Sequence, residues 1–350
     1  MNDQLLLANK TFKAFRERCP TDIEFQDLSY SVPDGRKSSK CILKNVSGKF
    51  ISGQLTAILG PSGAGKTSLL HILAGYKHIG TTGNILVNGQ TRNVEKFKKI
   101  SRYIMQVDYF QPYLTVQESM KIAADLKLGS QENRKNKEIM INESLEFLGL
   151  NHCRNTLAKS LSGGEKKRFS IALELINNPP VIFLDEPTTG LDDVACFQCI
   201  GLLQLLARGG RTVVCVVHTP SAKLFSAFDN TYFINQGQCV YQGYGPSVVS
   251  YLSNLGLVCP MSYSPADFMM EVCCKEYGDF QNKMVISIKN GRNTEYYKDD
   301  IGKNVSETNQ ATLAKSEYLE KMKKISFLDQ FLILTSRMLM QIWRTKLVVY

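Results

Sequence analysis

The octapeptide GPSGAGKT at residues 60–67 constrains the fold of this chain more than any other feature. It fits the pattern G-x-x-x-x-G-K-[ST] of a phosphate-binding loop. A continuous apolar run, residues 55–59, precedes it, and an apolar pattern with helical spacing follows it. The glycines let successive backbone N–H groups turn toward phosphate oxygens, and the following helix adds the partial positive charge of its N-terminus. The sequence therefore predicts a P-loop nucleotide site between a buried strand and a helix.

The side chains of this loop predict how phosphates and a magnesium ion are held. Lys66 is expected to reach the β- and γ-phosphates, and the Thr67 hydroxyl is expected to bind Mg²⁺. The candidate nucleotide-binding residues of the loop are Gly60, Pro61, Ser62, Gly63, Ala64, Gly65, Lys66, Thr67 and Ser68. The expected cofactors are therefore ATP and Mg²⁺.

A second motif, VIFLDEP at residues 181–187, places two acids at the end of an apolar run. The carboxyl ends of parallel strands face the ligand crevice of a doubly wound sheet, so both acids can meet the nucleotide. Asp185 is expected to hold Mg²⁺ through water, and Glu186 is expected to polarise the attacking water as a general base. Two acids after a strand are common by themselves, and the P-loop upstream makes this pair specific.

A third motif, LSGGEKKR at residues 161–168, predicts a second backbone nest at a helix start. Ser162, Gly163 and Gly164 of this nest would face a γ-phosphate. The order of P-loop, LSGGEKKR, LDEP, GLD and the lone strand-end His218 resembles the nucleotide-binding domain of ATP-binding-cassette (ABC) proteins. The resemblance implies that the nest serves the nucleotide on the P-loop of a second subunit, so that two nucleotides lie between two cassettes.

The same resemblance implies roles for three further side chains. Gln106 in YIMQVDYF matches the loop glutamine that contacts Mg²⁺ and the attacking water. His218 matches the switch histidine that contacts the γ-phosphate, and Asp192 matches the aspartate of the dimer interface. Where many family members have an adenine-stacking aromatic residue, this chain has Val32, with Tyr30 two residues earlier. The selectivity for the nucleotide base therefore stays open.

Longer phrases resemble one branch of this family, the G subfamily of half-transporters with its White protein and its cholesterol and phospholipid exporters. GPSGAGKTSLLHILAGY, IALELINNPPVIFLDEPTTGLD, GQCVYQG and SPADFMMEV carry this resemblance over residues 22–275. Thr219 stands where the branch usually has Gln, Thr189 and Asp193 stand where Ser is common, and Glu165 stands where Gln is frequent. None of these departures removes a catalytic group. The resemblance implies ATP hydrolysis that drives export of a lipid or sterol, after pairing with a second half-transporter or a second copy.

Alternating strand and helix patterns predict an α/β fold. The expected architecture is a P-loop NTPase of the ABC ATPase type, with a mixed sheet core, an antiparallel β subdomain and a helical subdomain at about residues 107–165. The expected domains are an N-terminal extension (1–21), the cassette (22–275), a polar linker (276–325) and an amphipathic connecting helix (326–350). The ten cysteines include a single CxxC and no nearby histidine pair, which favours reduced thiols over zinc or disulfides.

The last 20 residues, FLILTSRMLMQIWRTKLVVY, predict an amphipathic helix rather than a membrane span. A span needs roughly 20 apolar residues with few charges, and three cations interrupt this run. At about 100° per residue, Gln330, Arg337, Gln341 and Arg344 share one face. By the resemblance, the basic face would lie toward headgroups at the cytoplasmic surface of a membrane, and the apolar face would pack on the cassette or on a first span. The chain thus resembles a half-transporter cut at the membrane boundary.

Two other functions stay open at this point. A net charge of +10 suits a soluble cassette ATPase that acts on nucleic acid. Proteins of that kind carry two cassettes or a long coiled-coil insertion, whereas only about 55 residues separate Gln106 from Leu161, so nucleic acid is not an expected partner. A chain without spans of its own could also pair with a complete half-transporter as a non-transporting regulator. The motifs do not predict the transported substrate.

Overall fold

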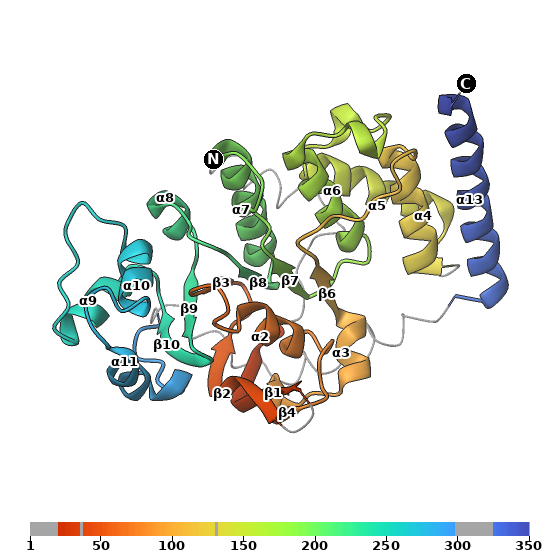
Figure 1. Ribbon diagram of the computed structural model, residues 1–350. Coiled ribbons are helices and arrows are strands. Elements are labelled where there is room, and N and C mark those ends of the chain that lie inside the picture. The colour runs from red at the N-terminus through yellow and green to blue at the C-terminus, as the bar shows by residue number, and fades with distance from the viewer. Residues whose placement is uncertain (1–19, 36–37, 130–131, 298–324, 350) are drawn as a thin grey trace.

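The computed structural model describes residues 20–35, 38–129, 132–297 and 325–349 (Figure 1). Residues 1–19 of the expected N-terminal extension and residues 298–324 of the expected linker lie outside this part of the chain.

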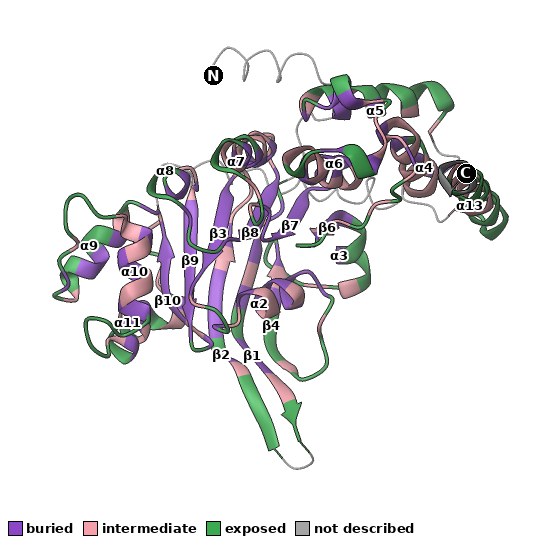
Figure 2. Cartoon of the chain, turned by 45° about the horizontal axis from the view of Figure 1, so that its top comes forward, coloured by how far each residue is buried: buried purple, intermediate pink, exposed green. Residues whose placement is uncertain are grey.

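A six-stranded mixed sheet in the order β10-β9-β3-β8-β7-β6 forms the core. Five strands run parallel to one another: β6 (Ser101–Ile104), β7 (Val181–Asp185), β8 (Thr212–Val216), β3 (Leu55–Leu59) and β9 (Asn230–Asn235). The sixth strand, β10 (Gln238–Gly243), is antiparallel to its neighbour β9. Every residue of β3, β7 and β8 is buried, which explains their continuous apolar runs (Figure 2). Parallel pairing brings the carboxyl ends of these strands to one edge.

A four-stranded antiparallel sheet in the order β2-β1-β4-β5 forms the predicted β subdomain. Its strands are β1 (Ile23–Asp34), β2 (Ser38–Phe50), β4 (Thr81–Val87) and β5 (Gln90–Thr91). The far end of the β1–β2 hairpin is exposed, as Figure 2 shows. Its near end packs on the core sheet, where the rings of Phe25 and Phe50 lie 5.7 and 5.9 Å from the ring of Tyr232 in β9. This aromatic cluster joins the two sheets.

The predicted helical subdomain consists of α4 (Val116–Leu128), α5 (Arg134–Phe147), two short 3₁₀ turns and α6 (Gly163–Leu175). The sequence supplies a cap for each helix. Thr115 and Ser162 form capping boxes with glutamates three residues later, and the Asn133 side chain accepts the N–H of Asn136. Residues 176–180 connect α6 to β7 of the core sheet, so the LSGGEKKR helix and the acidic strand are consecutive elements of the chain.

The other helices cover the sheets or extend the cassette on the β10 side (Figure 1). They are α2 (Lys66–Leu73), α3 (Val94–Ile100), α7 (Asp193–Arg208), α8 (Ala222–Phe225), α9 (Ser247–Asn254) and α10 (Pro265–Cys273). Helix α2 follows the P-loop directly, as the sequence predicts, and it contacts β7 and β8.

The polar segment after residue 275 is folded in its first part, so the expected linker boundary is wrong there. Helix α11 (Gln281–Ser287) and the 3₁₀ turn η5 (Lys289–Gly291) lie against β10. Met284 and Ile288 are fully buried, and the Tyr297 hydroxyl donates a 2.7 Å hydrogen bond to a main-chain carbonyl of β2. Sequence composition missed this segment because few apolar side chains, in a polar background, fix it to the sheet.

The C-terminal helix α13 (Phe327–Val349) forms as predicted, but its polar face contacts the cassette. The Arg344 guanidinium donates to both carboxylate oxygens of Glu118 at 2.7 and 2.8 Å, and the Gln341 side chain donates to that of Gln111. The large apolar side chains exposed on α13 are Phe327, Leu328, Phe331, Leu332, Met338, Leu339, Ile342 and Trp343. Of the two partners expected for the apolar face, the cassette is therefore wrong for these side chains, because an acid on α4 selects the basic face; packing on a first span stays a prediction.

In the described part of the chain, no helix has the length and apolar character that a membrane crossing requires.

Candidate functional site

The P-loop follows β3 and bends through three glycines with positive φ, Gly60 (145°), Gly63 (75°) and Gly65 (107°). A Cβ atom on Gly60 would lie 2.0 Å from the carbonyl oxygen of Ile234 in β9, so only glycine lets the loop approach this strand. Gly65 is the N-cap of α2. The first N–H groups of α2 are thus directed toward the loop, as a phosphate site requires.

Lys66 is a buried cation, 6 % exposed, at the start of α2. Its Nζ donates to the carbonyl oxygens of Gly60 (2.8 Å) and Pro61 (3.0 Å), so it braces the loop across its own turn. Burial lowers the pKa of this ammonium, and the attraction of Glu186 and Asp185 opposes that shift. A cation held in this way can pair with phosphate oxygens that enter the loop.

Asp185 ends β7 beside the P-loop, and hydroxyl groups donate to both of its carboxylate oxygens. Thr67 Oγ1 donates to Oδ1 at 3.2 Å, and the Tyr103 hydroxyl donates to Oδ2 at 3.0 Å. Burial, and next the charge of Asp185, raise the pKa of Tyr103, so its phenol remains a donor. Hydroxyl and carboxylate oxygens at this spacing suit a hard cation such as Mg²⁺.

Glu186 follows Asp185 in a left-handed conformation, with φ +49° and 9 % exposure. Side chains from three loops meet its carboxylate. Gln106 Nε2 donates to Oε2 at 2.6 Å, Thr189 Oγ1 donates to the same oxygen at 3.0 Å, and His218 Nε2 lies 2.6 Å from Oε1. A left-handed conformation in a residue other than glycine is strained, and such strain clusters at functional sites.

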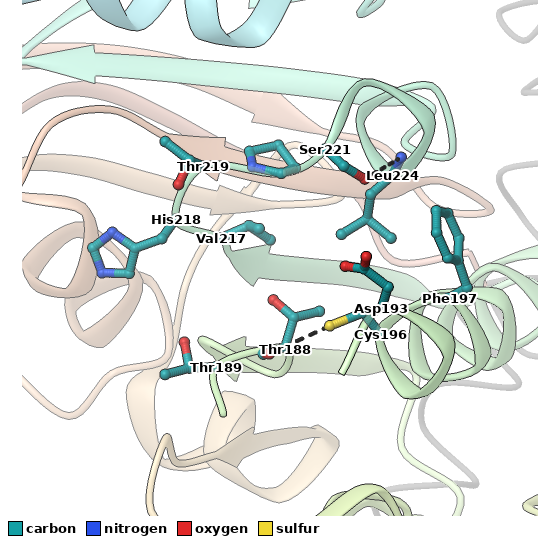
Figure 3. A pocket seen from close by; sticks show the side chains of 11 residues that line it. Thr188, Thr189, Asp193, Cys196, Phe197, Val217, His218, Thr219, Ser221 and Leu224 are labelled. Carbon is teal, nitrogen blue, oxygen red and sulfur yellow. Dashed lines mark hydrogen bonds between the residues drawn. The ribbon is translucent and has the colours of Figure 1, made fainter. Parts of the chain in front are cut away.

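The pocket in Figure 3 lies next to this cluster. Thr188 and Thr189 line it from the loop after β7, Asp193 lines it from α7, and the segment after β8 contributes His218 and Thr219. Three positions where the sequence departs from the related branch, Thr189, Asp193 and Thr219, therefore lie together at one pocket.

The remaining predicted residues form a second group. Ser162, Gly163, Gly164 and Asp192 line a separate pocket between the starts of α6 and α7. Ser162 caps α6 and Asp192 caps α7, each accepting a backbone N–H three residues on. Among the described residues, no hydrogen bond joins this group to the P-loop group of the same chain.

Glu165 completes the capping box of α6 and pairs with His152. The Ser162 N–H donates to one carboxylate oxygen at 2.8 Å, and His152 Nε2 lies 2.8 Å from the other. The Ser162 N–H and then His152 lower the pKa of Glu165 to about 2. Glu165 is therefore a fixed part of the helix start.

Three functional candidates were missed by sequence reasoning: Tyr103, Thr189 and Lys167. Tyr103 and Thr189 touch the two acids, and Lys167 contacts the Gln106 loop. The available signal for Tyr103 is a hydroxyl on a half-buried strand, which favours a polar partner. Tyr30, the aromatic residue two positions before Val32, is 7 % exposed and belongs to the core. Its ring therefore has little exposed surface for stacking on adenine.

Comparison with known proteins agrees with these motifs. The sequence profile described as "ABC transporter" matches residues 43–189. ABC transporter G family member 1 of Dictyostelium discoideum is 36% identical over 263 residues, which are 72% of this chain and 33% of that protein. Protein scarlet of Drosophila melanogaster is 39% identical over 248 residues, 68% of this chain and 37% of that protein. ABC transporter G family member 26 of Arabidopsis thaliana is 32% identical over 362 residues, 91% of this chain and 53% of that protein.

The chain belongs to the G subfamily of ABC transporters. It spans about a third to a half of the length of these relatives. Two solved structures share the fold of this ABC cassette. Each is 24% identical in sequence to this chain, and each match covers 63% of this chain and 98% of the solved structure. They are a bacterial ABC transporter cassette solved as a dimer (TM-score 0.54) and a dimeric post-hydrolysis state bound to ADP and Pi (TM-score 0.55). The predicted ABC ATPase fold is confirmed.

Proposed function

We propose that this chain is the ATP-binding and ATP-hydrolysing cassette of a G-type half-transporter. The observation that carries the proposal is the cluster at the carboxyl edge of the core sheet, where Lys66, Asp185 and Glu186 meet side chains from separate loops. Gln106 and His218 both contact the Glu186 carboxylate. Such a convergence of a phosphate-binding cation, an acid for a metal and a held general base suits nucleotide hydrolysis.

The P-loop would hold the phosphates of ATP through its backbone N–H groups and Lys66. Ser68, near the start of α2, would serve with them. Mg²⁺, when bound, would neutralise phosphate charge, and its ligands would be Thr67, Gln106 and Asp185. The fit rests on the hard oxygen atoms of Thr67 and Asp185, which lie 3.2 Å apart.

Glu186 would accept a proton from the attacking water. Gln106 and Thr189 both donate to one of its carboxylate oxygens, which restricts rotation of the carboxylate. His218 holds the other oxygen, and it is exposed enough to reach a γ-phosphate as well. A general base must be held within hydrogen-bond reach of its proton, and this arrangement provides such a hold.

Ser162, Gly163, Gly164 and Asp192 would act on the nucleotide of a second cassette, contributed by another half-transporter or by a second copy. Their separation from the P-loop group within one chain supports this assignment. ATP-driven closure of the pair would then drive export of a lipid or sterol across a membrane whose cytoplasmic face carries the cassette. The proposed cassette runs from residue 22 to 275, with residues 281–297 folded onto it.

The test is Mg²⁺-dependent ATP hydrolysis by residues 1–350 over a range of protein concentrations. Turnover should rise faster than linearly with concentration, because two chains form each site, and Glu186→Gln should abolish it while ATP binding persists. Lys66→Ala should weaken ATP binding itself. Turnover that survives in Glu186→Gln, or that stays strictly linear with concentration, would contradict the proposal.

A further inference from the structure

Lys167 is a buried lysine in α6, and it fastens this helix to the loop that carries Gln106. Its Nζ donates to the carbonyl oxygens of Met105 (3.3 Å) and Gln106 (3.1 Å) and to the Asp108 carboxylate (3.0 Å). An ammonium has three N–H donors, and these contacts match all three. The side chain is 4 % exposed.

A buried lysine with a full set of partners needs a reason, because Lys is almost never buried unless paired. The adjacent Lys166 of α6 is partly exposed, and its side chain makes no hydrogen bond or ion pair among those described for this part of the chain. The two neighbours therefore share a helix and a side-chain type but differ in what they hold. Only Lys167 fixes the main chain on both sides of the Gln106 Cα atom.

The same helix starts at the SGG nest. Ser162 is the N-cap and Lys167 lies five residues later, about 7–8 Å along the helix axis. About 1.4 turns of continuous helix thus separate the nest from the three hydrogen bonds on the Gln106 loop. Gln106 in turn contacts Glu186 at 2.6 Å. A displacement of the helix start must move the loop, or must break the Lys167 contacts.

We propose that Lys167 is a positioning residue that couples the two nucleotide sites of a cassette pair. This inference rests on the proposed function, in which the nest serves the partner's nucleotide and Gln106 serves the chain's own. Contact of the nest with the partner's nucleotide fixes the position of α6. Lys167 then fixes the Gln106 loop relative to α6, and Gln106 in turn positions Glu186. Each site is then completed for hydrolysis when the other is filled.

The test compares Lys167→Met, which keeps the aliphatic stem, with Lys166→Met as the matched control and Asp108→Asn as a milder variant. Steady-state ATP hydrolysis gives kcat, KM and the Hill coefficient for ATP. Lys167→Met should lower kcat by about 10- to 100-fold, because a small misplacement of catalytic groups has effects of that order. Its KM should stay within about threefold of wild type, since Lys66 is untouched, and its Hill coefficient should fall to one.

Hydrogen–deuterium exchange supplies a readout that needs no turnover. In wild type, ATP should slow exchange at residues 105–108 together with the start of α6, and in Lys167→Met these two regions should respond separately. Lys166→Met should behave as wild type in every measurement. Asp108→Asn keeps an acceptor for Lys167, so it should lower kcat and the Hill coefficient less than Lys167→Met does.

Three outcomes would overturn the inference: a folded Lys167→Met with wild-type kcat and cooperativity, equal effects in Lys166→Met, or a wild-type Hill coefficient of one. If thermal unfolding shows that Lys167→Met does not fold, Asp108→Asn decides, and unchanged exchange and cooperativity in that variant would refute the coupling. Failure of the proposed function is a separate result, because it appears as turnover in Glu186→Gln whatever Lys167 does.

Discussion

Replacing Arg344 by methionine is expected to release α13 from the helical subdomain. The guanidinium makes two hydrogen bonds to the Glu118 carboxylate and one, at 2.9 Å, to the Tyr113 carbonyl. Hydrogen bonds to charged groups contribute about 1.5–3 kcal/mol and exposed ion pairs about 0.2–1 kcal/mol. The two side chains are 29% and 30% exposed. We therefore expect the substitution to cost about 1–2 kcal/mol of docking free energy. This loss would raise the equilibrium constant for undocking of α13 by roughly 5- to 30-fold.

The chain contains a single tryptophan, Trp343, next to the substituted residue, and this provides the assay. Trp343 is already 67% exposed, so undocking should change its intensity little. Undocking should lower the fluorescence anisotropy of Trp343, because a released helix rotates more freely. Arg337→Met is the matched control: Arg337 lies on the same helix, and no ion pair to the cassette is formed by it among the described residues. An anisotropy in Arg344→Met equal to that of wild type, or an equal drop in both variants, would refute the reasoning.

Acid should produce the same release in wild type. Arg344 is the main cause that lowers the pKa of Glu118 to about 2, from an ordinary value of 4.5. A lowered carboxyl pKa stabilises the docked state above pH 4.5, and this contribution is lost as the pH falls toward 2. Trp343 anisotropy should therefore decrease through this range in wild type and change little in Arg344→Met. Circular dichroism in the far ultraviolet checks that the cassette remains folded over the range used.

Three further substitutions test the site and the folded C-terminal segment. Tyr103→Phe removes one of the two hydroxyl donors to Asp185, so the Mg²⁺ concentration for half-maximal hydrolysis should rise by about tenfold while metal-free ATP binding is unchanged. Thr189→Val removes one of the donors that hold Glu186 and should lower kcat more than it changes KM. Gly291→Ala should lower the free energy of unfolding by more than 1 kcal/mol in denaturant titration, because φ is +90° and a Cβ would lie 1.9 Å from a β2 carbonyl oxygen. A Tyr103→Phe variant with a wild-type Mg²⁺ requirement, a Thr189→Val variant with only KM altered, or a fully stable Gly291→Ala variant would contradict these assignments.

The P-loop and the acidic strand end could be predicted because their chemistry is local. Lys66 and Thr67 stand within one octapeptide, and Asp185 and Glu186 follow one apolar run, so spacing alone indicates what they can hold. The parallel sheet then brings both motifs to one edge, which the alternation of strands and helices also predicts. Tyr103 could not be assigned in this way, since its role depends on the pairing of β6 with β7, which brings its hydroxyl to an acid 82 residues away in sequence.

The two faces of α13 could be predicted from periodicity, but the face that contacts the cassette could not. Amphipathicity gives two surfaces, and general experience assigns the apolar one to a protein core. Here the choice is made by Glu118, which is 226 residues away in sequence and has carboxylate oxygens available beyond its capping role. Nothing in the helix's own pattern carries that information.

Glu118 also shows how α13 and the Gln106 loop are connected. It caps α4 through Thr115, so Arg344 holds the start of α4 as well as α13. Residues 105–118 are thereby held at both ends, by Lys167 near Gln106 and by Arg344 at the helix start. Between these ends, the ring of Phe110 stacks on that of Phe169 in α6 at 4.9 Å.

We expect a segment fixed in this way to transmit a displacement of α13 rather than to bend. The shift must pass through α4 into the helical subdomain, or along the main chain to Gln106 and its 2.6 Å contact with Glu186. The same segment therefore connects the C-terminal helix to Glu186, the residue proposed to accept a proton from the attacking water. Loss of the Arg344 contact should consequently alter hydrolysis through kcat rather than through ATP affinity, because none of these contacts involves the P-loop.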